Sequence, residues 1–387
     1  MTRTANHLFA WPGVSTRPVR IWVLAPHIAT NDENIDYYYD FSQSIDEYTR
    51  VFESLQLDWK WQPVTMNDFK DHIQLIENEK NNGSHFPLVL NLCDGDEIND
   101  TPGVSVIEEL QKRQLIYTGA DEAFYRITTS KIPMKEAFDA HCVDTPKWKL
   151  VDKNTDAVAL FQEVGSPLII KPAISGGSMG VGVKNVVEDK DALLRLMESM
   201  EEGYRGWNLL ADGLIAEAFI NGPEYTVLIC GDHTQPDNIR VYDPVERVFH
   251  SSLPDKEKFL SFERLWEIYE TESAMPGNDN FYEYRQIGKD IAEEIKQLTK
   301  AAFLATNGVG YARADIRGDK NNGKLYMLEI NAQCGISEDE NFTSIGAILR
   351  YGQVGFHQLV FDILQEAMQK HHSLVLAEQQ RTLSSQS

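Results

Sequence analysis

The chain has 387 residues, of which 42% are hydrophobic and 25% charged, as is typical of a folded globular protein rather than a disordered or fibrous one. Its 59 acidic and 36 basic residues give a formal net charge of −23 at pH 7, which disfavours nucleic acids and anionic membranes as partners. No apolar run approaches the roughly 18 residues of a membrane span, and the N-terminus lacks the long apolar core of a secretory signal, so we expect a cytoplasmic protein. An organelle transit peptide is the alternative that the arginine and two threonines near the N-terminus leave open.

The first third of the chain alternates strands with helices. The predicted elements are a strand at 20–25, a helix at 44–57, a strand at 87–92, a helix near 105–113 and a short strand at 115–117. An acidic loop follows the second of these strands. The alternation predicts an open, largely parallel sheet, which we assign to an N-terminal α/β domain of residues 17–118.

The rest of the chain divides into a small α+β module at 119–220, a C-terminal domain at 221–372 and a polar tail at 373–387 that we expect to be frayed. The predicted elements are a helix at 131–141, strands at 168–171 and 181–187, a helix at 190–200, strands at 214–220 and 225–230, a helix at 287–305, two further strands and a last helix at 356–370. Residues 242–280, which mix charges with aromatics, form either a substrate-facing insert or surface loops.

The four cysteines, Cys93, Cys142, Cys230 and Cys334, show no CxxC spacing. This pattern favours neither a zinc site nor a disulfide framework. We therefore expect each cysteine to be a small buried apolar residue.

A glycine-rich loop at 175–182 directly follows the strand that ends in Lys171. Glycine lets backbone N–H groups close around phosphate oxygens, so such a loop is able to hold a triphosphate. Val183 follows Gly182, so the loop is not a Walker A motif, and it does not match a dinucleotide-binding GxGxxG turn either. Taken alone, the loop is equally typical of a flexible hairpin without a ligand.

Two strands near the C-terminus carry charged residues in strict alternation. Arg313, Asp315 and Arg317 share one face of the first strand, and Glu329 and Asn331 share one face of the second. The predicted opposite face of the second strand carries Tyr326, Leu328 and Ile330. If the strands form a hairpin, three oxygen ligands converge in a set that suits Mg²⁺. A solvated edge strand is the alternative, but Glu329 lies among apolar residues, where an unpaired charge would cost several kcal/mol.

Together these segments resemble the ATP-grasp ligases, and within them the D-alanine–D-alanine ligase branch, over about residues 115–365. The resemblance rests on the ordered set Tyr117-Thr-Gly119, Thr129-Ser-Lys131, Ile170-Lys-Pro172 with its glycine loop, Ile215 to Tyr225, Ala312-Arg-Ala-Asp315 and Leu328-Glu-Ile-Asn331. It implies an α/β ATP-grasp fold of three domains: an N-terminal open parallel sheet, a small α+β lid module and a C-terminal mixed-sheet domain.

The resemblance also implies roles in binding ATP. Lys131 and Lys171 match the two lysines that hold the phosphates, and Ser178 lies in the phosphate loop. Each lysine by itself is more often a surface residue. The remaining nucleotide contacts implied by the resemblance are the adenine-reading segment Glu217, Phe219 and Ile220 and the ribose-binding carboxylate Glu224.

The metal ligands and the activity follow from the same resemblance. Asp315, Glu329 and Asn331 match the ligands of two Mg²⁺ ions, for which Mn²⁺ is an alternative, and Arg313 matches the arginine that stabilises an oxyanion. The implied reaction joins a carboxylate, such as a small amino acid, to an amine through an acyl phosphate. The glycine-rich loop would be a lid against water, no protein nucleophile is needed, and Cys334 is not expected to be one.

Two departures concern the substrates. The family's Gly-Gly-x-Ser-x-Glu segment, whose glutamate holds an ammonium group, is absent after the first strand, where Asp32, Glu33 and Asp36 are candidate replacements. After Gly335, a carboxylate-binding serine is replaced by Glu340 within an acidic triplet, which repels a carboxylate. We therefore expect that D-alanyl-D-alanine is not the main product.

Two other functions stay open at this point. One is an ATP-grasp enzyme with a non-amine acceptor, and the other is a nucleotide-binding regulatory protein without catalysis. The family branch also implies a homodimer as an expectation.

Overall fold

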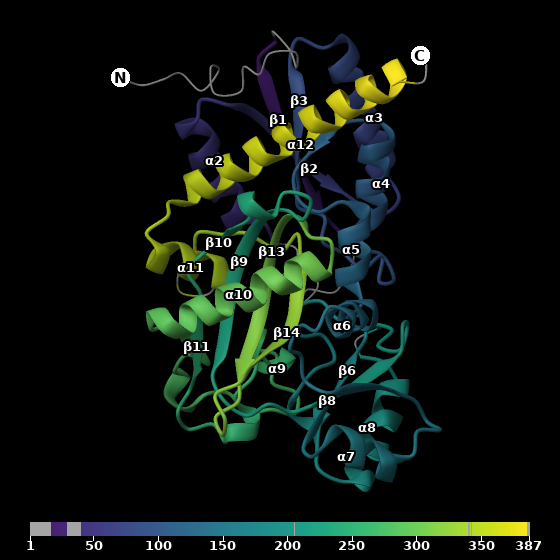
Figure 1. Ribbon diagram of the computed structural model, residues 1–387, viewed down its shortest axis with the longest axis vertical. Coiled ribbons are helices and arrows are strands. Elements are labelled where there is room, and N and C mark those ends of the chain that lie inside the picture. The colour runs from purple at the N-terminus through teal and green to yellow at the C-terminus, as the bar shows by residue number, and fades with distance from the viewer. Residues whose placement is uncertain (1–16, 29–39, 205, 340, 342, 385–387) are drawn as a thin grey trace.

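The structure is a computed structural model that describes residues 17–28, 40–204, 206–339, 341 and 343–384. Within these residues it contains three β-sheets, ordered β2-β1-β3-β4, β5-β8-β6-β7 and β12-β11-β9-β13-β14, with β10 paired to β9 (Figure 1). The first sheet and the helices around it form the N-terminal part, the second belongs to a small module, and the third is the large sheet of the C-terminal part. This arrangement confirms the predicted three-part α/β architecture, but the large sheet is antiparallel in every strand pair, so the expectation of a mixed C-terminal sheet was wrong.

The N-terminal sheet is parallel throughout, as predicted. Its elements are β1 (Val19–Pro26), α2 (Ser42–Ser54), β2 (Asp58–Val64), α3 (Phe69–Asn82), β3 (Phe86–Asn91), α4 (Val104–Lys112) and β4 (Ile116–Tyr117). The sequence analysis missed β2 and α3, because β2 is an edge strand that alternates polar and aromatic residues over a half-buried surface. The order of connections reverses at β1, so the carboxyl ends of β1 and β3 flank a topological switch point.

The middle of the chain contains a small antiparallel sheet with two covering helices. Its elements are α5 (Glu122–Thr129), α6 (Lys131–Ala140), β5 (Trp148–Val151), α7 (Ala157–Val164), β6 (Leu168–Pro172), η2 (Val183–Asn185), β7 (Val186–Val187), α8 (Lys190–Glu201) and β8 (Leu214–Ala218). The strand predicted at 181–187 was wrong for its first part, which is a 3₁₀ turn. The Asn185 side chain holds this turn by donating to the carbonyls of Ile170 and Gly180 and accepting from the Gly182 N–H.

The C-terminal part is built around the large sheet. Its elements are β9 (Glu224–Asp232), η3 (Pro236–Asn238), β10 (Arg240–Val241), β11 (Val245–Phe249), η4 (Asp255–Glu257), α9 (Phe262–Leu265), η5 (Pro276–Asn278), β12 (Tyr282–Gln286), α10 (Lys289–Ala305), β13 (Val309–Gly318), β14 (Leu325–Ala332), α11 (Ser344–Gly352) and α12 (Phe356–Ser384). Helix α12 does not end at Lys370 as predicted, so most of the expected tail is helical. No helix in the described residues is long and apolar enough to cross a membrane.

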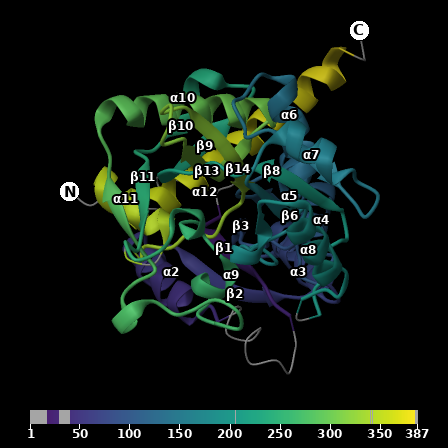
Figure 2. The same ribbon diagram turned by 90° about the horizontal axis from the view of Figure 1, so that it is seen from below.

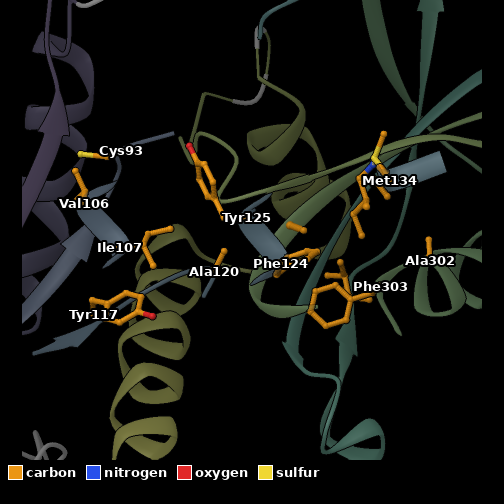
Figure 3. Packing of buried hydrophobic residues seen from close by; sticks show 14 of the residues in the cluster. Cys93, Val106, Ile107, Tyr117, Ala120, Phe124, Tyr125, Met134, Ala302 and Phe303 are labelled. Carbon is orange, nitrogen blue, oxygen red and sulfur yellow. The ribbon is translucent and has the colours of Figure 1, made fainter. Parts of the chain in front are cut away.

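Two hydrophobic clusters join the N-terminal sheet to the large sheet. In one of them Phe124 of α5 packs edge-on against Phe303 of α10, with ring centroids 5.3 Å apart (Figure 3). A close backbone contact adds to this junction, since a Cβ on Gly310 (φ +82°) would lie 2.3 Å from the carbonyl oxygen of Gly119. The module of β6, β8, α7 and α8 has a core of its own and lies to one side of the large sheet (Figures 1 and 2).

Candidate active site

Strands β13 and β14 form the predicted hairpin and bring the acidic residues together. Asp315 pairs with Glu329 and Arg313 pairs with Asn331 across the strands. The Asn331 amide nitrogen lies 3.2 Å from a Glu329 oxygen and 3.4 Å from Asp315 Oδ2. The Arg313 guanidinium donates to the same Asp315 oxygen at 2.9 and 3.1 Å. The convergence expected from strand alternation is therefore present.

A β-bulge beside this cluster corrects one detail of the predicted faces. Ile316 pairs with Met327 rather than with Leu328, so Leu328 is the extra residue. Met327 consequently joins Ile330 in the core, and Tyr326 lies opposite Arg317. The prediction that Tyr326, Leu328 and Ile330 share a face was wrong. It assumed strict alternation along the whole strand, and a bulge interrupts that alternation.

The donor set of this cluster fits a hard divalent cation. Asp315 Oδ1 is buried without a hydrogen-bond partner among the described residues, and a buried carboxylate oxygen in that state needs a cation or a donor. In the described part of the chain no three His, Cys, Asp or Glu residues cluster as a metal site. Two carboxylates and the Asn331 amide oxygen are therefore the available ligands, and Mg²⁺ completes such a shell with water and substrate phosphate oxygens.

A second buried carboxylate, Glu217 on β8, lies between two lysines. Lys135 Nζ lies 2.5 Å from one of its oxygens, Lys171 contacts the other, and the Glu217 side chain is 1% exposed. Burial alone would raise the pKa of Glu217, but the two lysines outweigh this effect and lower its pKa to about 2. Lys135 was missed by the sequence analysis, although its spacing of four residues from Lys131 on α6 places both on one helix face.

Lys131 connects the two acidic centres. Its ammonium lies 3.7 Å from a Glu329 oxygen, and burial lowers the pKa of Lys131 against the opposing effect of that carboxylate. Burial opposes ionisation of Glu329 as well, yet Lys131, Lys171 and Arg313 together lower the pKa of Glu329. The cluster is thus a charged network in which cations and carboxylates stabilise one another.

Glu224 at the start of β9 is held by two arginines. Arg317 Nη1 donates to it at 2.6 Å, Arg247 contacts its other oxygen, and the Glu224 side chain is 5% exposed. Phe219 lies next to this triad, with the Arg317 guanidinium over its ring and Phe259 edge-on to it. Arg247 was also missed, although it occupies a core-facing position of β11, where an arginine needs a buried partner.

The glycine-rich loop is covered by the stretch 242–280. Trp266 Nε1 donates to the Gly177 carbonyl at 2.9 Å, and the Phe262 N–H donates to the Val181 carbonyl at 2.8 Å. Glu272 accepts from the Val183 N–H at 2.8 Å. Of the two interpretations left open for this stretch, the structure favours an insert that packs over the loop.

A cleft of about 180 Å³ opens beside the hairpin and the glycine-rich loop, and Lys171, Glu217, Glu224 and Asp315 are not among the residues that line it. Its lining includes Lys131, Arg313, Glu329, Asn331, Gly335, Ser175, Gly176 and Gly177, together with Asp94 and Asp96 from the loop after β3. Ser178, in a left-handed conformation at φ +64°, belongs to the same loop but is outside that lining. Asp94 and Asp96 were not predicted as site residues, although their place at the carboxyl end of a parallel strand was a signal.

Some predicted residues are not part of this geometry. Glu340, and the candidates Asp32, Glu33 and Asp36, lie outside the described residues. Cys334 is buried and burial raises the pKa of its thiol to about 12, which disfavours a nucleophilic role. Cys142 is exposed, which corrects the expectation that all four cysteines are buried.

Comparison with known proteins identifies the family. The family model described as D-ala D-ala ligase C-terminus matches residues 138–365, which is more than half of the chain. The chain belongs to this family. As a member of the D-ala D-ala ligase family, it is an ATP-dependent ligase that forms a carbon–nitrogen bond, and the matched region spans β13, β14 and the glycine-rich loop.

Relatives and solved structures agree with this assignment. The D-alanine–D-alanine ligase of Halorhodospira halophila is 29% identical over 252 residues, covering 65% of this chain and 71% of the relative. The D-alanine–D-alanine ligase of Bacillus anthracis complexed with ATP superposes with a TM-score of 0.63 at 18% identity, covering 92% of this chain and 99% of that one. VanG D-Ala:D-Ser ligase from Enterococcus faecalis gives 0.62 at 15% identity, covering 91% and 99%. These structures share the fold of this D-ala D-ala ligase family member.

Proposed function

We propose that the chain activates a small amino acid or related carboxylate with ATP and joins it to an amine through an acyl phosphate. The observation that carries this proposal is the convergence of Asp315, Glu329 and Asn331 beside Arg313. Arg313, Glu329 and Asn331 line one cleft with Lys131 and the glycine-rich loop. Phosphoryl transfer requires such a concentration of positive charge around the transferred group.

In this proposal Asp315, Glu329 and Asn331 would hold Mg²⁺, expected as two ions, with Mn²⁺ as a substitute. The unpaired Asp315 Oδ1 supports a cation at this place. Such ions would supply positive charge that neutralises the phosphate oxygens during transfer. The Asn331 amide, which here donates to both carboxylates, presents its oxygen after a half-turn about its last side-chain bond.

The nucleotide would lie between β6, β8 and the large sheet. Lys131 and Lys171 would bind its phosphates together with the loop around Ser178. The segment Glu217, Phe219 and Ile220 would read the adenine and Glu224 the ribose hydroxyls. Both carboxylates are engaged by cations in the present structure, so ATP has to share or displace these contacts.

The reaction then needs two displacements. A substrate carboxylate oxygen attacks the γ-phosphorus of ATP and ADP leaves, which gives an acyl phosphate. The amine nitrogen next attacks the acyl carbon, phosphate leaves with the bonding electrons, and the nitrogen loses a proton. Arg313 would stabilise the oxyanion of the tetrahedral intermediate, and the loop covered by Trp266 would exclude water from the acyl phosphate.

Family membership disfavours the two alternatives, a non-amine acceptor and a regulatory protein without catalysis. The buried charge network would also be costly to keep without a ligand to bind. A cytoplasmic location and a homodimer remain predictions of this proposal. Size measurement by light scattering tests the dimer.

The test is a phosphate-release screen of carboxylate and amine pairs, with hydroxylamine as a trap in parallel. Hydroxylamine converts an acyl phosphate into a stable hydroxamate, so a hydroxamate formed only with ATP supports the proposed route. ADP production without hydroxamate for any carboxylate contradicts it. Glu329→Gln is the negative control, because it removes one of the proposed metal ligands.

A further inference from the structure

A second chamber of about 170 Å³ opens beside the cleft, at the switch point of the N-terminal sheet. Its walls are mostly apolar and come from both the N-terminal and C-terminal parts: Pro26, Phe41, Tyr48, Leu92, Tyr311 and Ile336. Asp94, Gln333, Cys334 and Gly335 line both the chamber and the cleft, so the two spaces meet at these residues.

Three polar groups at the chamber are without a partner. Asp94 forms no hydrogen bond or ion pair with another described residue, and its carboxylate reaches solvent through the cleft. The hydroxyls of Tyr48 and Tyr311 are buried and unpaired among the described residues. Tyr48, Tyr311 and Asp94 line the same chamber. Buried hydroxyls are nearly always hydrogen-bonded, and orphaned ones indicate a missing partner.

We propose that Asp94 binds the ammonium group of the carboxylate-donating substrate, and that this substrate is an α-amino acid with a bulky apolar side chain. This inference rests on the ligase function proposed above. An ammonium has three N–H donors, which match a carboxylate and the lone pairs of two hydroxyls. The substrate carboxylate then points toward Arg313, which lines the adjoining cleft together with Asp94.

The volume of the chamber indicates which substrate side chains fit it best. An apolar cavity of about 150 Å³ accommodates benzene, so 170 Å³ has room for a leucine or phenylalanine side chain. A methyl group would leave most of the apolar wall without contacts, and each buried CH₂ group contributes about 0.8 kcal/mol. The chamber therefore favours such donors over alanine.

Hydroxylamine trapping tests the donor site alone, because hydroxylamine replaces the second substrate. The donors are both enantiomers of alanine, leucine and phenylalanine, and 3-phenylpropionate, which lacks the ammonium. We expect kcat/KM for leucine or phenylalanine to exceed that for alanine by at least tenfold. We also expect kcat/KM for 3-phenylpropionate to be at least tenfold lower than kcat/KM for phenylalanine.

Three variants complete the test. Asp94→Asn is expected to raise the KM of the amino acid at least tenfold, to leave the KM of ATP within twofold, and to remove the disadvantage of 3-phenylpropionate. Leu92→Phe, which narrows the chamber, is expected to lower kcat/KM for phenylalanine but not for alanine. Asp100→Asn is the matched control, because Asp100 lies in the same loop but outside both cavities. This variant should change neither the KM of the amino acid nor the preference for phenylalanine over 3-phenylpropionate.

The outcomes separate the two proposals. A wild-type preference for alanine, or an unchanged amino acid KM in Asp94→Asn, overturns this inference and leaves the ligase function standing. If the wild-type protein forms no hydroxamate from any carboxylate, the proposed function fails and this inference fails with it.

Discussion

The two walls of the cleft differ in charge and in how their charges are held. The wall built from α6 and the large sheet carries Lys131, Arg313 and Glu329, each paired with an opposite charge. The wall from the N-terminal sheet contributes Asp94, which has no ion-pair partner in the described residues. A paired network is rigid and ready to bind a polyanion, whereas a lone carboxylate in a concave site is ready to bind a small cation.

The largest effect is expected on the paired wall. Glu329→Gln should lower kcat about 10³-fold, because it removes the charge of a proposed metal ligand beside the proposed site of phosphoryl transfer. Steady-state ADP release measures this loss. The control is Glu283→Gln, an exposed residue of β12 in the same sheet, which should retain activity. Near-normal turnover in Glu329→Gln would contradict the proposed metal site.

The second prediction concerns the stability of the paired wall. Glu224→Gln should lower the free energy of unfolding by about 3 kcal/mol, because Arg247 and Arg317 then lose the charge that compensates their burial. Urea unfolding measures the difference. Glu246→Gln breaks a neighbouring pair with Arg285, which is largely exposed, and should cost less than about 1 kcal/mol. Equal losses of unfolding free energy in the Glu224→Gln and Glu246→Gln variants would contradict the buried triad of Glu224, Arg247 and Arg317.

A smaller effect is expected from pH on the unpaired wall. Asp94 is exposed on its cleft side, but partial desolvation by the surrounding protein raises its pKa to about 6, so protonation below that pH removes its charge and weakens ammonium binding. We expect kcat/KM for the amino acid to fall up to tenfold per pH unit below 6, and this limb to vanish in Asp94→Asn. The free energy of unfolding is expected to change in the opposite direction. The pKa of Asp94 in the folded state lies above its value in the unfolded chain, so Asp94 adds stability as the pH falls from about 6 toward 4.

The titratable neighbours of Asp94 fall into two groups. Its buried neighbours are Cys93, Tyr125, Tyr311 and Cys334, and burial raises the pKa of each of these four, so they are neutral at pH 6. The charged residues Asp96, Lys131, Arg313 and Glu329 line the same cleft. An unchanged acidic limb in Asp94→Asn would therefore assign the titration to the substrate or to the paired wall.

The smallest effect is expected at the cover of the glycine-rich loop. Trp266→Phe keeps the aromatic ring but removes the N–H that donates to Gly177, a hydrogen bond of about 1 kcal/mol. We expect the KM of ATP to rise about three- to fivefold, as measured by initial rates. Trp22→Phe, in the N-terminal sheet, removes an indole donor to Glu79 and should leave this KM unchanged.

The sequence predicted those parts of the fold and site that depend on short-range periodicity. Alternation in β13 and β14 was sufficient to bring Asp315, Glu329 and Asn331 together, because neighbouring strands of a hairpin pair in register. Apolar runs and glycine positions likewise predicted the three-part architecture. The bulge at Leu328 and the 3₁₀ turn at Asn185 were not predictable in this way, because each depends on contacts made by one particular backbone path.

The tertiary structure decided which charges are paired and which are left free. The buried ion pairs join segments that are distant in the sequence. Lys135 pairs with Glu217, and both Arg247 and Arg317 pair with Glu224. The chamber around Asp94 forms only where the N-terminal sheet and the large sheet meet. Sequence periodicity determines the face on which a side chain lies, but burial and ion pairing are properties of the packed chain and set the energy of each charge.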